Sequence, residues 1–459
     1  MAPVAVPYVL LQGTDKQTRS PNIFWGRRQH VSAFSGLLSL GLVVGSIFLT
    51  LFLHICLEHF GGSIWAAITE PLFVQSPFVF ILRYLPAVSA GPVLGYAGWV
   101  VVQAMLYTVV PGKVVHGPPT PGGHSHPYLM NGLSCWFLTL CGFVLAGYVG
   151  GVGAIASIAR SWGSLLVVAN IYGLITAVLA YVKAHVSPTF ERDRRFSGSI
   201  LHDFLAGIEL NPRLGALWDV KLFQIGRVGM NSWVLIDLAF MAKQYEAFGS
   251  ISNSMVAVTL FHAIYTIDFF VNEDWYLSTI DIALDHFGFC LGWGPAAWLP
   301  MIYTIQAQYL ALYPTHLPWG IFSVLLMAGV AGYILFRLSN YEKQILRGSG
   351  SNRFIESRQR VISAQYTTGS GDIHESRLLY SGCWGIVRHP NYIGDIIFSF
   401  CTCVTCGWNY ILPYIYFIYM TCLLVHRCHR DEKRCSTKYG AYWEQYKRLV
   451  PWRMVPGIL

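Results

Sequence analysis

Long apolar runs alternate with polar segments along the chain. An α-helix needs about 20 mostly apolar residues to cross the hydrocarbon core of a bilayer, so each long run predicts one span. The last run, Tyr392–Leu424, is long enough for two helices with a break near Gly407–Pro413. The other runs lie at Ser32–His54, Val88–Val110, Gly132–Ala154, Trp162–Tyr181, Met230–Phe240 with its flanks, Met255–Val271, Phe287–Leu312 and Pro318–Phe336. The pattern predicts an all-α, polytopic integral membrane protein with about ten transmembrane helices.

The polar segments between these runs carry most of the basic residues. With an even number of spans, both termini and the loops after the second, fourth and eighth spans share one side. Those segments hold the basic residues of 183–227, 343–388 and 427–453, whereas the opposite loops hold little beyond Arg160 and Lys243. The positive-inside rule therefore places both termini in the cytoplasm. We expect a cytoplasmic N-terminal segment at 1–31, with no cleavable signal peptide, and one membrane domain at 32–459.

Composition agrees with a membrane protein and excludes several other classes. The chain has 459 residues, of which 54% are hydrophobic and 12% charged. A soluble domain carries roughly 25% charged residues, so a soluble multidomain enzyme, a disordered chain and a coiled coil are all disfavoured. The net charge is +8, and the basic residues lie in the loops between the apolar runs. This distribution reflects the orientation of the chain in the membrane and does not indicate a nucleic-acid partner. Most of the eleven cysteines lie in apolar runs, where a thiol acts as a small hydrophobe, and we expect neither disulfides nor a metal site.

Polar clusters at or near the spans are the candidates for chemistry, because polar groups are costly there. In 266–276, Asp268, Asn272 and Tyr276 recur every four residues and would share one helix face. A buried carboxylic acid on such a face could donate a proton, although an interfacial loop is equally compatible with the pattern. The segment 207–215, GIELNPRLG, reads more simply as a solvated loop with turn residues.

Two further clusters are basic. In 384–395, Pro390 suits the first turn of a helix whose N-terminus, beside Arg388 and His389, would favour an anion such as a phosphate. The segment 426–440 is dense in arginine and lysine, which commonly bind phosphates. The same residues are equally compatible with a charged tail that lies on an anionic membrane face. Neither a GxGxxG motif nor a P-loop is present, so a nucleotide would need another kind of site. The late loops therefore indicate a basic pocket in a membrane enzyme or transporter.

Together these clusters resemble the sterol reductase family, from roughly residue 86 to the last residue. The similarity is strongest in GIELNPRLG, IYTIDFFVNEDWY, DHFGFCLGWG, SGCWGIVRHPNYIGD, HRCHRDEKRCSTKYG and VPWRMVPGIL. The resemblance implies an endoplasmic-reticulum protein with ten spans that uses NADPH to reduce a ring double bond of a sterol. The segment 240–244, Leu291–Gly294 and the 426–435 block favour the 7-dehydrocholesterol branch. Pro390, in HPNYIGD, is instead typical of the delta-14 branch.

The resemblance also implies site residues. The part from about 340 to 459 would form the NADPH pocket, with lysine and arginine holding the phosphates and aromatic faces holding the rings. Its cofactor-binding residues would be Lys343, Arg347, Leu379, Trp384, Asn391, Tyr392, Asp431, Cys435, Ser436, Thr437, Lys438, Tyr439 and Tyr446.

Reduction of an unactivated alkene requires a proton as well as a hydride, so a buried acid must face the cofactor across the sterol. The motif places Tyr392 near the nicotinamide. Glu273 and Asp285 are the catalytic candidates beside it, with Asp268 and Tyr303 as further candidates for the proton or for contact with the 3-hydroxyl. The sterol would enter sideways from the bilayer, because so apolar a substrate barely leaves the lipid. Membrane lipids and other enzymes of the sterol pathway are the remaining expected partners.

Two other functions compete with sterol reduction. Isoprenylcysteine carboxyl methyltransferases share an RHPxYxG block and cytoplasmic cofactor loops, but they are much shorter and lack GIELNPRLG. A non-catalytic sterol-binding or transport protein could retain the same fold, and the loss of a cofactor residue would indicate it. Every cofactor residue implied by the resemblance is in place, so the sequence favours an enzyme.

Overall fold

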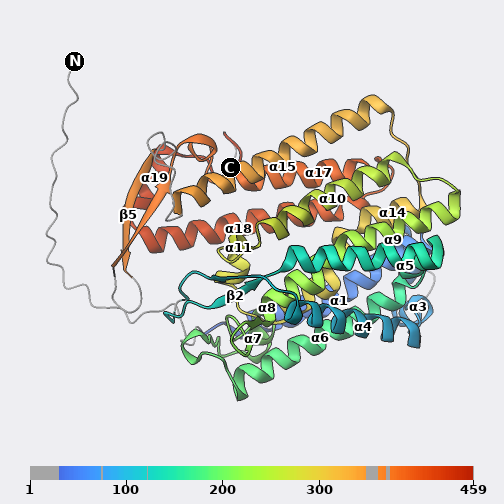
Figure 1. Cartoon of the computed structure of the whole chain (residues 1–459), viewed down its shortest axis with the longest axis horizontal. Helices are drawn as coiled ribbons and strands as arrows, with labels where there is room; N and C mark the ends of the chain where they lie inside the picture. Colours follow the sequence, from blue (N-terminus) through green and yellow to red (C-terminus); the bar gives the residue numbers. More distant parts are fainter. Residues whose placement is uncertain (1–29, 74–75, 121, 348–359, 368–372, 458–459) are drawn as a thin grey trace, which may run out of the picture.

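The fold is a bundle of long helices that run roughly side by side (Figure 1). The computed structural model describes residues 30–457 except 74–75, 121, 348–359 and 368–372, so nearly all of the predicted segment 1–31 lies outside the described residues. The long helices are α1 (Ala33–His59), α4 (Ala90–Val109), α5 (Gly132–Arg160), α6 (Trp162–Val186), α9 (Asn231–Phe248), α10 (Asn253–Val271), α15 (Trp319–Arg347), α17 (Pro390–Val404) and α18 (Ile415–Tyr439).

Shorter helices connect and extend the bundle. Two π-helices, η2 (Phe223–Met230) and η3 (Gly294–Tyr303), lead into α9 and into α14 (Ile305–Leu312). The others are α2 (Ile64–Phe73), α3 (Pro77–Tyr84), η1 (Glu191–Asp193), α7 (Ile200–Ala206), α8 (Val220–Leu222), α11 (Glu273–Tyr276), α12 (Ile280–Ala283), α13 (Phe289–Trp293), η4 (Gly382–Gly385), η5 (Leu412–Tyr414) and α19 (Ala441–Leu449).

Three antiparallel hairpins complete the described part of the fold, and the apolar pattern did not predict them. Each joins two strands that are neighbours in the sequence, in the registers Lys113↔Met130, Arg213↔Asp219 and Val361↔Leu379. The pairs are β1 (Lys113–His116) with β2 (Pro127–Met130), β3 (Arg213–Leu214) with β4 (Trp218–Asp219), and β5 (Val361–Thr367) with β6 (Ile373–Leu379).

The structure confirms a mostly helical, multi-pass membrane protein. Within the described ranges, six helices are long and apolar enough to cross a bilayer, namely α1, α4, α5, α6, α10 and α15. Many of their apolar side chains face outward, such as Phe34 at 69% exposure and Val149 at 79%, as expected for a surface in contact with lipid. Helices also occupy the other predicted runs, but they are shorter, interrupted by π-helical turns, or more polar.

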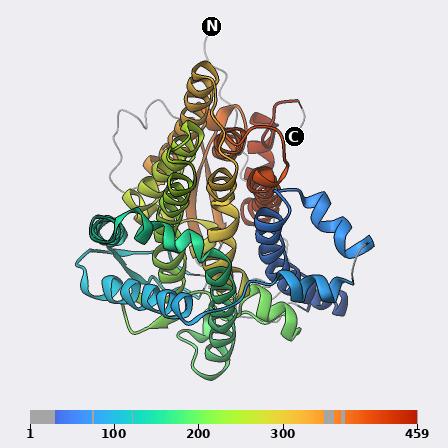
Figure 2. The same ribbon diagram turned by 90° about the vertical axis from the view of Figure 1, so that its right-hand side faces the viewer.

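The polar segments gather at one end of the bundle. The β1–β2 hairpin, α7, α8, β5 and α19 all lie toward the left in Figure 1, although they follow different spans. Viewed along the helices, α1 to α3 flank the bundle on one side (Figure 2). The main apolar core forms where α1, α9, α10, α14 and α18 meet, around buried residues such as Leu53, Phe240, Met255 and Tyr416. This arrangement agrees with the common side that the charge pattern predicts for these loops.

Two elements extend beyond their predicted limits. The eighth apolar run ends at Phe336, but α15 continues to Arg347 because the polar residues that follow are good helix formers. Lys343 therefore projects from a rigid helix and not from a loop. The polar segment that follows the eighth apolar run also contains the β5–β6 hairpin, whose β-branched and aromatic residues pack on Cys435, Tyr439 and Trp443.

Close packing of two glycines joins α15 to α17. A Cβ atom at Gly394 would lie 2.5 Å from the carbonyl oxygen of Gly332, and one at Gly332 would lie 2.9 Å from the carbonyl oxygen of Gly394. Only glycine allows two helix backbones to approach this closely. The contact fixes the first turns of α17, which carry Tyr392 and Asp395.

We expect Gly394→Ala to destabilise the protein by about 1–3 kcal/mol, because the added methyl group must push α17 away from α15. Equilibrium unfolding in detergent micelles measures the loss. Gly320→Ala is the matched control, since a Cβ atom at Gly320 has no neighbour within 4 Å. Equal stability of the two variants would contradict the close-packing interpretation.

Candidate active site

A cavity of about 420 Å³ connects the C-terminal elements to the interior of the bundle. At its polar end the walls come from α15, β6, η4, α17, α18 and α19. At its other end they come from η2, α9, α10 and η3, with aromatic side chains such as Trp233, Trp298 and Tyr303. One continuous space therefore has a charged end and an apolar, aromatic end.

The structure brings together most of the cofactor residues implied by the resemblance. Nine of them line this cavity: Lys343, Leu379, Trp384, Asn391, Tyr392, Asp431, Cys435, Tyr439 and Tyr446. Ser436, Thr437 and Lys438 are exposed on α18 and lie outside the cavity wall. Arg347 is the last residue of α15, and its side chain lies outside the described part.

Cations and aromatic rings lie next to each other at the charged end. The ammonium of Lys343 lies 3.1 Å from the centroid of the Trp384 ring, a cation–π contact, and the Trp384 indole N–H donates a 2.8 Å hydrogen bond to the Ser339 carbonyl. On α19, Trp443 stacks on Tyr446 with ring centroids 5.0 Å apart. Flat faces and cations in one wall suit a ligand that carries both rings and phosphates.

The side chain of Asp431 is ionised in this wall. Burial alone would raise its pKa, but Arg434, Lys343 and His389 outweigh burial and lower the pKa below its usual value. Asp431 forms an ion pair with Arg434 and accepts a 3.8 Å contact from the thiol of Cys435. Burial raises the pKa of that thiol to about 11, so Cys435 is a neutral wall residue.

Several buried polar atoms at the start of α17 and on α15 beside it have no hydrogen-bond partner among the described residues. They are Nε2 of His389, Oδ1 of Asn391 and Nδ2 of Asn340, although the two amides bond to each other through their remaining atoms at 3.2 Å. The His389 ring is stacked on Tyr392 with centroids 4.9 Å apart. Buried polar atoms need partners, so His389 and Asn391, which both line the cavity, fit a polar ligand there.

His389 gives the protein a specific acid sensitivity. Burial lowers its pKa to about 3 in the folded protein, against 6.5 for an unperturbed histidine. The unfolded chain therefore binds the extra proton first, and folding loses stability as the pH falls from 6.5 toward 3, by up to ~1.4 kcal/mol per pH unit. We expect His389→Gln to reduce the fall in unfolding free energy between pH 6.5 and pH 5 by about 1.6 kcal/mol. Unfolding in micelles at both pH values measures it.

His374→Gln is the control for this prediction, because His374 is exposed on β6. Its pH dependence should match that of the wild type. If the His389 and His374 variants lost stability equally on acidification, His389 would not be the buried neutral histidine described here.

Two of the predicted catalytic carboxylates lie outside the cavity. Glu273 is buried in an ion pair with Arg227, 2.5 Å between Oε1 and Nη1, and accepts a 2.9 Å hydrogen bond from the Gly132 N–H. Asp285 pairs with Arg430 at 2.5 Å. Both are anchors between segments in this structure, whereas Asp268 and Tyr303 line the cavity. Asp268 pairs with Arg337 and accepts a hydrogen bond from Asn272.

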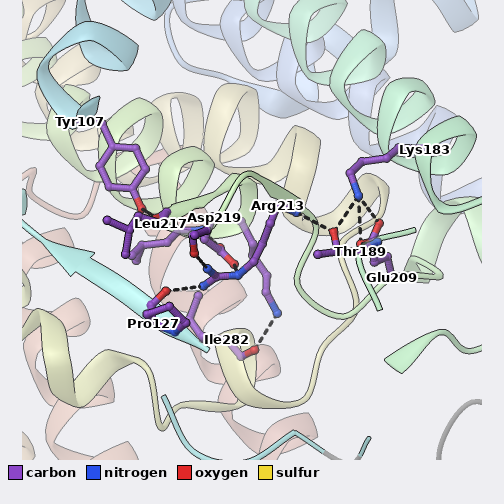
Figure 3. A network of polar contacts seen from close by, with 12 residues as sticks. Tyr107, Pro127, Lys183, Thr189, Glu209, Arg213, Leu217, Asp219 and Ile282 are labelled. Atoms are coloured by element: carbon purple, nitrogen blue, oxygen red, sulfur yellow. Dashed lines mark hydrogen bonds and ion pairs between the residues drawn. The ribbon is translucent and has the colours of Figure 1, made fainter. Parts of the chain in front are cut away.

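Residues 207–213 of the segment GIELNPRLG are buried, which corrects the interpretation of this segment as a solvated loop. Glu209 is 2% exposed and accepts two hydrogen bonds from Lys183, at 3.0 and 2.9 Å, and one from the Thr189 N–H at 2.7 Å (Figure 3). Nearby, Arg213 pairs with Asp219 at 3.6 Å (Figure 3). Glu209 and Arg213 therefore have their polar partners inside the protein and not in water.

This network supports one wall of the cavity. The ammonium of Lys221 donates hydrogen bonds of 2.9, 2.8 and 2.7 Å to the carbonyls of Asp281, Ile282 and Asp285, which fixes the 281–285 turn. Burial lowers the pKa of Lys221 to about 8. The carboxylate of Asp281 then pairs with Arg427 at 2.5 Å, and both residues line the cavity. Lys221 thereby fixes the 281–285 turn, and the turn then fixes the position of α18 through Arg427.

Metal and cysteine sites do not account for the function. Within the described residues, no group of three or more His, Cys, Asp or Glu side chains could hold a metal ion. All eleven cysteines are free, and Cys403 and Cys406, which form a CxxC motif, are buried. The features that define function are thus a multi-pass helical bundle and one cavity with a basic, aromatic end.

Comparison with known proteins identifies the family. Residues 40–459 match the model of the ergosterol biosynthesis ERG4/ERG24 family. The chain is 39% identical to the 7-dehydrocholesterol reductase of Danio rerio over 97% of this chain and 96% of the relative, and 38% identical to that of Xenopus laevis over 95% and 94%. It is 38% identical to the delta(14)-sterol reductase of Methylotuvimicrobium alcaliphilum over 79% and 82%. The chain therefore belongs to the ERG4/ERG24 family of sterol reductases, and it is an enzyme of sterol biosynthesis.

Proposed function

We propose that this protein reduces the delta-7 ring double bond of 7-dehydrocholesterol-type sterols with NADPH. The cavity carries the proposal, because the predicted cofactor residues and the aromatic membrane-side residues line one continuous space. The relatives named 7-dehydrocholesterol reductase support the delta-7 bond. The delta-14 bond is the second candidate, supported by the relative named delta(14)-sterol reductase and by Pro390.

The charged end of the cavity fits NADPH. Lys343 and Arg434 are cations beside it, Trp384 and Tyr446 offer flat faces, and the buried amide oxygen of Asn391 retains bonding capacity. Bound there, the cofactor would supply the hydride. The residues of the chain would hold the phosphates, orient the rings along α17 and keep water from the reacting carbons.

The apolar end fits a sterol that enters from the bilayer. Trp298, Leu299 and Phe269 are apolar wall residues, so burying a four-ring substrate among them is favourable. We propose that the protein lies in the endoplasmic-reticulum membrane, as the resemblance implies, with both termini cytoplasmic. The position of several polar segments at one end of the bundle supports a common side for these segments. The part 340–459 would then form the cytoplasmic cofactor pocket of a single domain.

A parallel substrate assay tests this function. Microsomes from yeast that lacks its own sterol reductases, expressing this chain, receive NADPH with either 7-dehydrocholesterol or a delta-8,14 dienol. We expect loss of the delta-7 bond only, detected by gas chromatography and mass spectrometry. Loss of the delta-14 bond alone would select the second candidate. Sterol binding without either product would favour a non-catalytic sterol protein.

A further inference from the structure

Four carboxyl groups line the cavity, and only one of them has no ion pair among the described residues. Asp268 pairs with Arg337, Asp281 with Arg427 and Asp431 with Arg434. The fourth, Asp395, is 5% exposed, and its Oδ1 is buried with no hydrogen-bond partner in the described structure. The sequence patterns did not single out this residue.

The position of Asp395 suits a role in the reaction. It follows Tyr392 by three residues on α17, so the two side chains share one face of the helix and line the same cavity. The close contact of Gly394 with Gly332 holds this turn against α15. Tyr265 from α10 also lines the cavity and is close enough to Asp395 to feel its charge.

Burial without a partner favours the neutral form of a carboxyl group. Taking a lone carboxylate out of water is costly, and such a group keeps its proton instead. Asp268, Asp281 and Asp431 each have a cation that stabilises the carboxylate, so they are poor proton donors. The cavity therefore contains one carboxylic acid that can give up a proton.

We propose that Asp395 is the proton donor for the reduction, an inference that rests on the proposed function. The O–H bond of Asp395 breaks and its proton forms a C–H bond with one carbon of the sterol double bond. The other carbon receives the hydride that NADPH supplies, so the sterol gains two hydrogens and the nicotinamide is oxidised. Asp395 is left as a carboxylate, which Arg427 can stabilise until a proton from water restores the acid.

The test compares Asp395→Asn with Asp395→Glu in the purified, full-length protein. Asparagine keeps the size but cannot donate this proton, so we expect turnover to fall by at least about 100-fold, the usual contribution of a general acid. Binding of NADPH and of the sterol should stay within about threefold of the wild type. Glutamate should restore part of the turnover. Ser399→Ala, one turn further along α17 and outside the cavity wall, should keep turnover within about twofold.

Infrared spectroscopy gives a second readout that does not depend on turnover. The wild type should show the carbonyl stretch of a protonated carboxyl group, which shifts in D₂O, is lost in Asp395→Asn and moves in Asp395→Glu. Wild-type turnover in Asp395→Asn, or the same band in the wild type and that variant, would overturn the proposal. If the wild type reduced neither sterol, the proposed function would fail instead, and the infrared band would still report on Asp395.

Discussion

Arg227→Met should destabilise the protein by about 3–5 kcal/mol, because it leaves the Glu273 carboxylate buried and unpaired. Arg227 is 0% exposed and Glu273 3%. Arg227 also donates a 2.9 Å hydrogen bond to Asn131, and Glu273 accepts one from the Gly132 N–H, so the pair joins η2 and α11 to the start of α5. Equilibrium unfolding in detergent micelles measures the loss.

The double variant Arg227→Met/Glu273→Gln should recover part of this loss, since it removes both charges. Arg160→Met is the control: Arg160 pairs with Glu246 at the same 2.5 Å, but its side chain is 49% exposed, so we expect a loss of at most about 1 kcal/mol. If Arg227→Met and Arg160→Met lost the same free energy of unfolding, burial of the Arg227–Glu273 pair would not explain its contribution to stability. Full turnover by a folded Glu273→Gln variant would further show that Glu273 is not a proton donor.

Lys343→Met should weaken NADPH binding about 10- to 150-fold, the effect of losing one charge-assisted hydrogen bond of about 1.5–3 kcal/mol. Lys343 projects from the end of α15 into the charged end of the cavity, above the Trp384 ring. Titration of cofactor fluorescence with the purified protein measures the dissociation constant.

Lys433→Met is the matched control, because Lys433 is exposed on α18 and outside the cavity wall. Its NADPH affinity should equal that of the wild type, and sterol affinity should be unchanged in both variants. If the Lys343 and Lys433 variants bound NADPH with equal affinity, Lys343 would not contact the phosphates of the cofactor.

The apolar pattern predicted the membrane class and the positions of the helices, because lipid imposes a minimum length and hydropathy on each span. The break near Gly407–Pro413 is also present, between α17 and η5. The pattern could not show that α15 continues through polar residues to Arg347, since hydropathy falls where the helix leaves the apolar region. It could not show the β5–β6 hairpin either, because this hairpin lies in a polar segment outside the apolar runs.

Among the residues named for the cofactor, those that are close in sequence also lie close in space. Asn391 and Tyr392 on α17, and Asp431 and Cys435 on α18, all line the cavity. The carboxylates were harder to predict, because their state depends on partners distant in sequence. Glu273 meets Arg227 across 46 positions, and Asp285 meets Arg430 across 145.

Two labelling experiments with 7-dehydrocholesterol test the central claim most directly. One uses NADPH deuterated at the transferred position in ordinary water, and the other uses ordinary NADPH in D₂O. We expect the product to gain one deuterium in each, because one new hydrogen comes from the cofactor and the other from an acid that exchanges with water. Product without label from the cofactor would contradict NADPH-dependent reduction of the sterol.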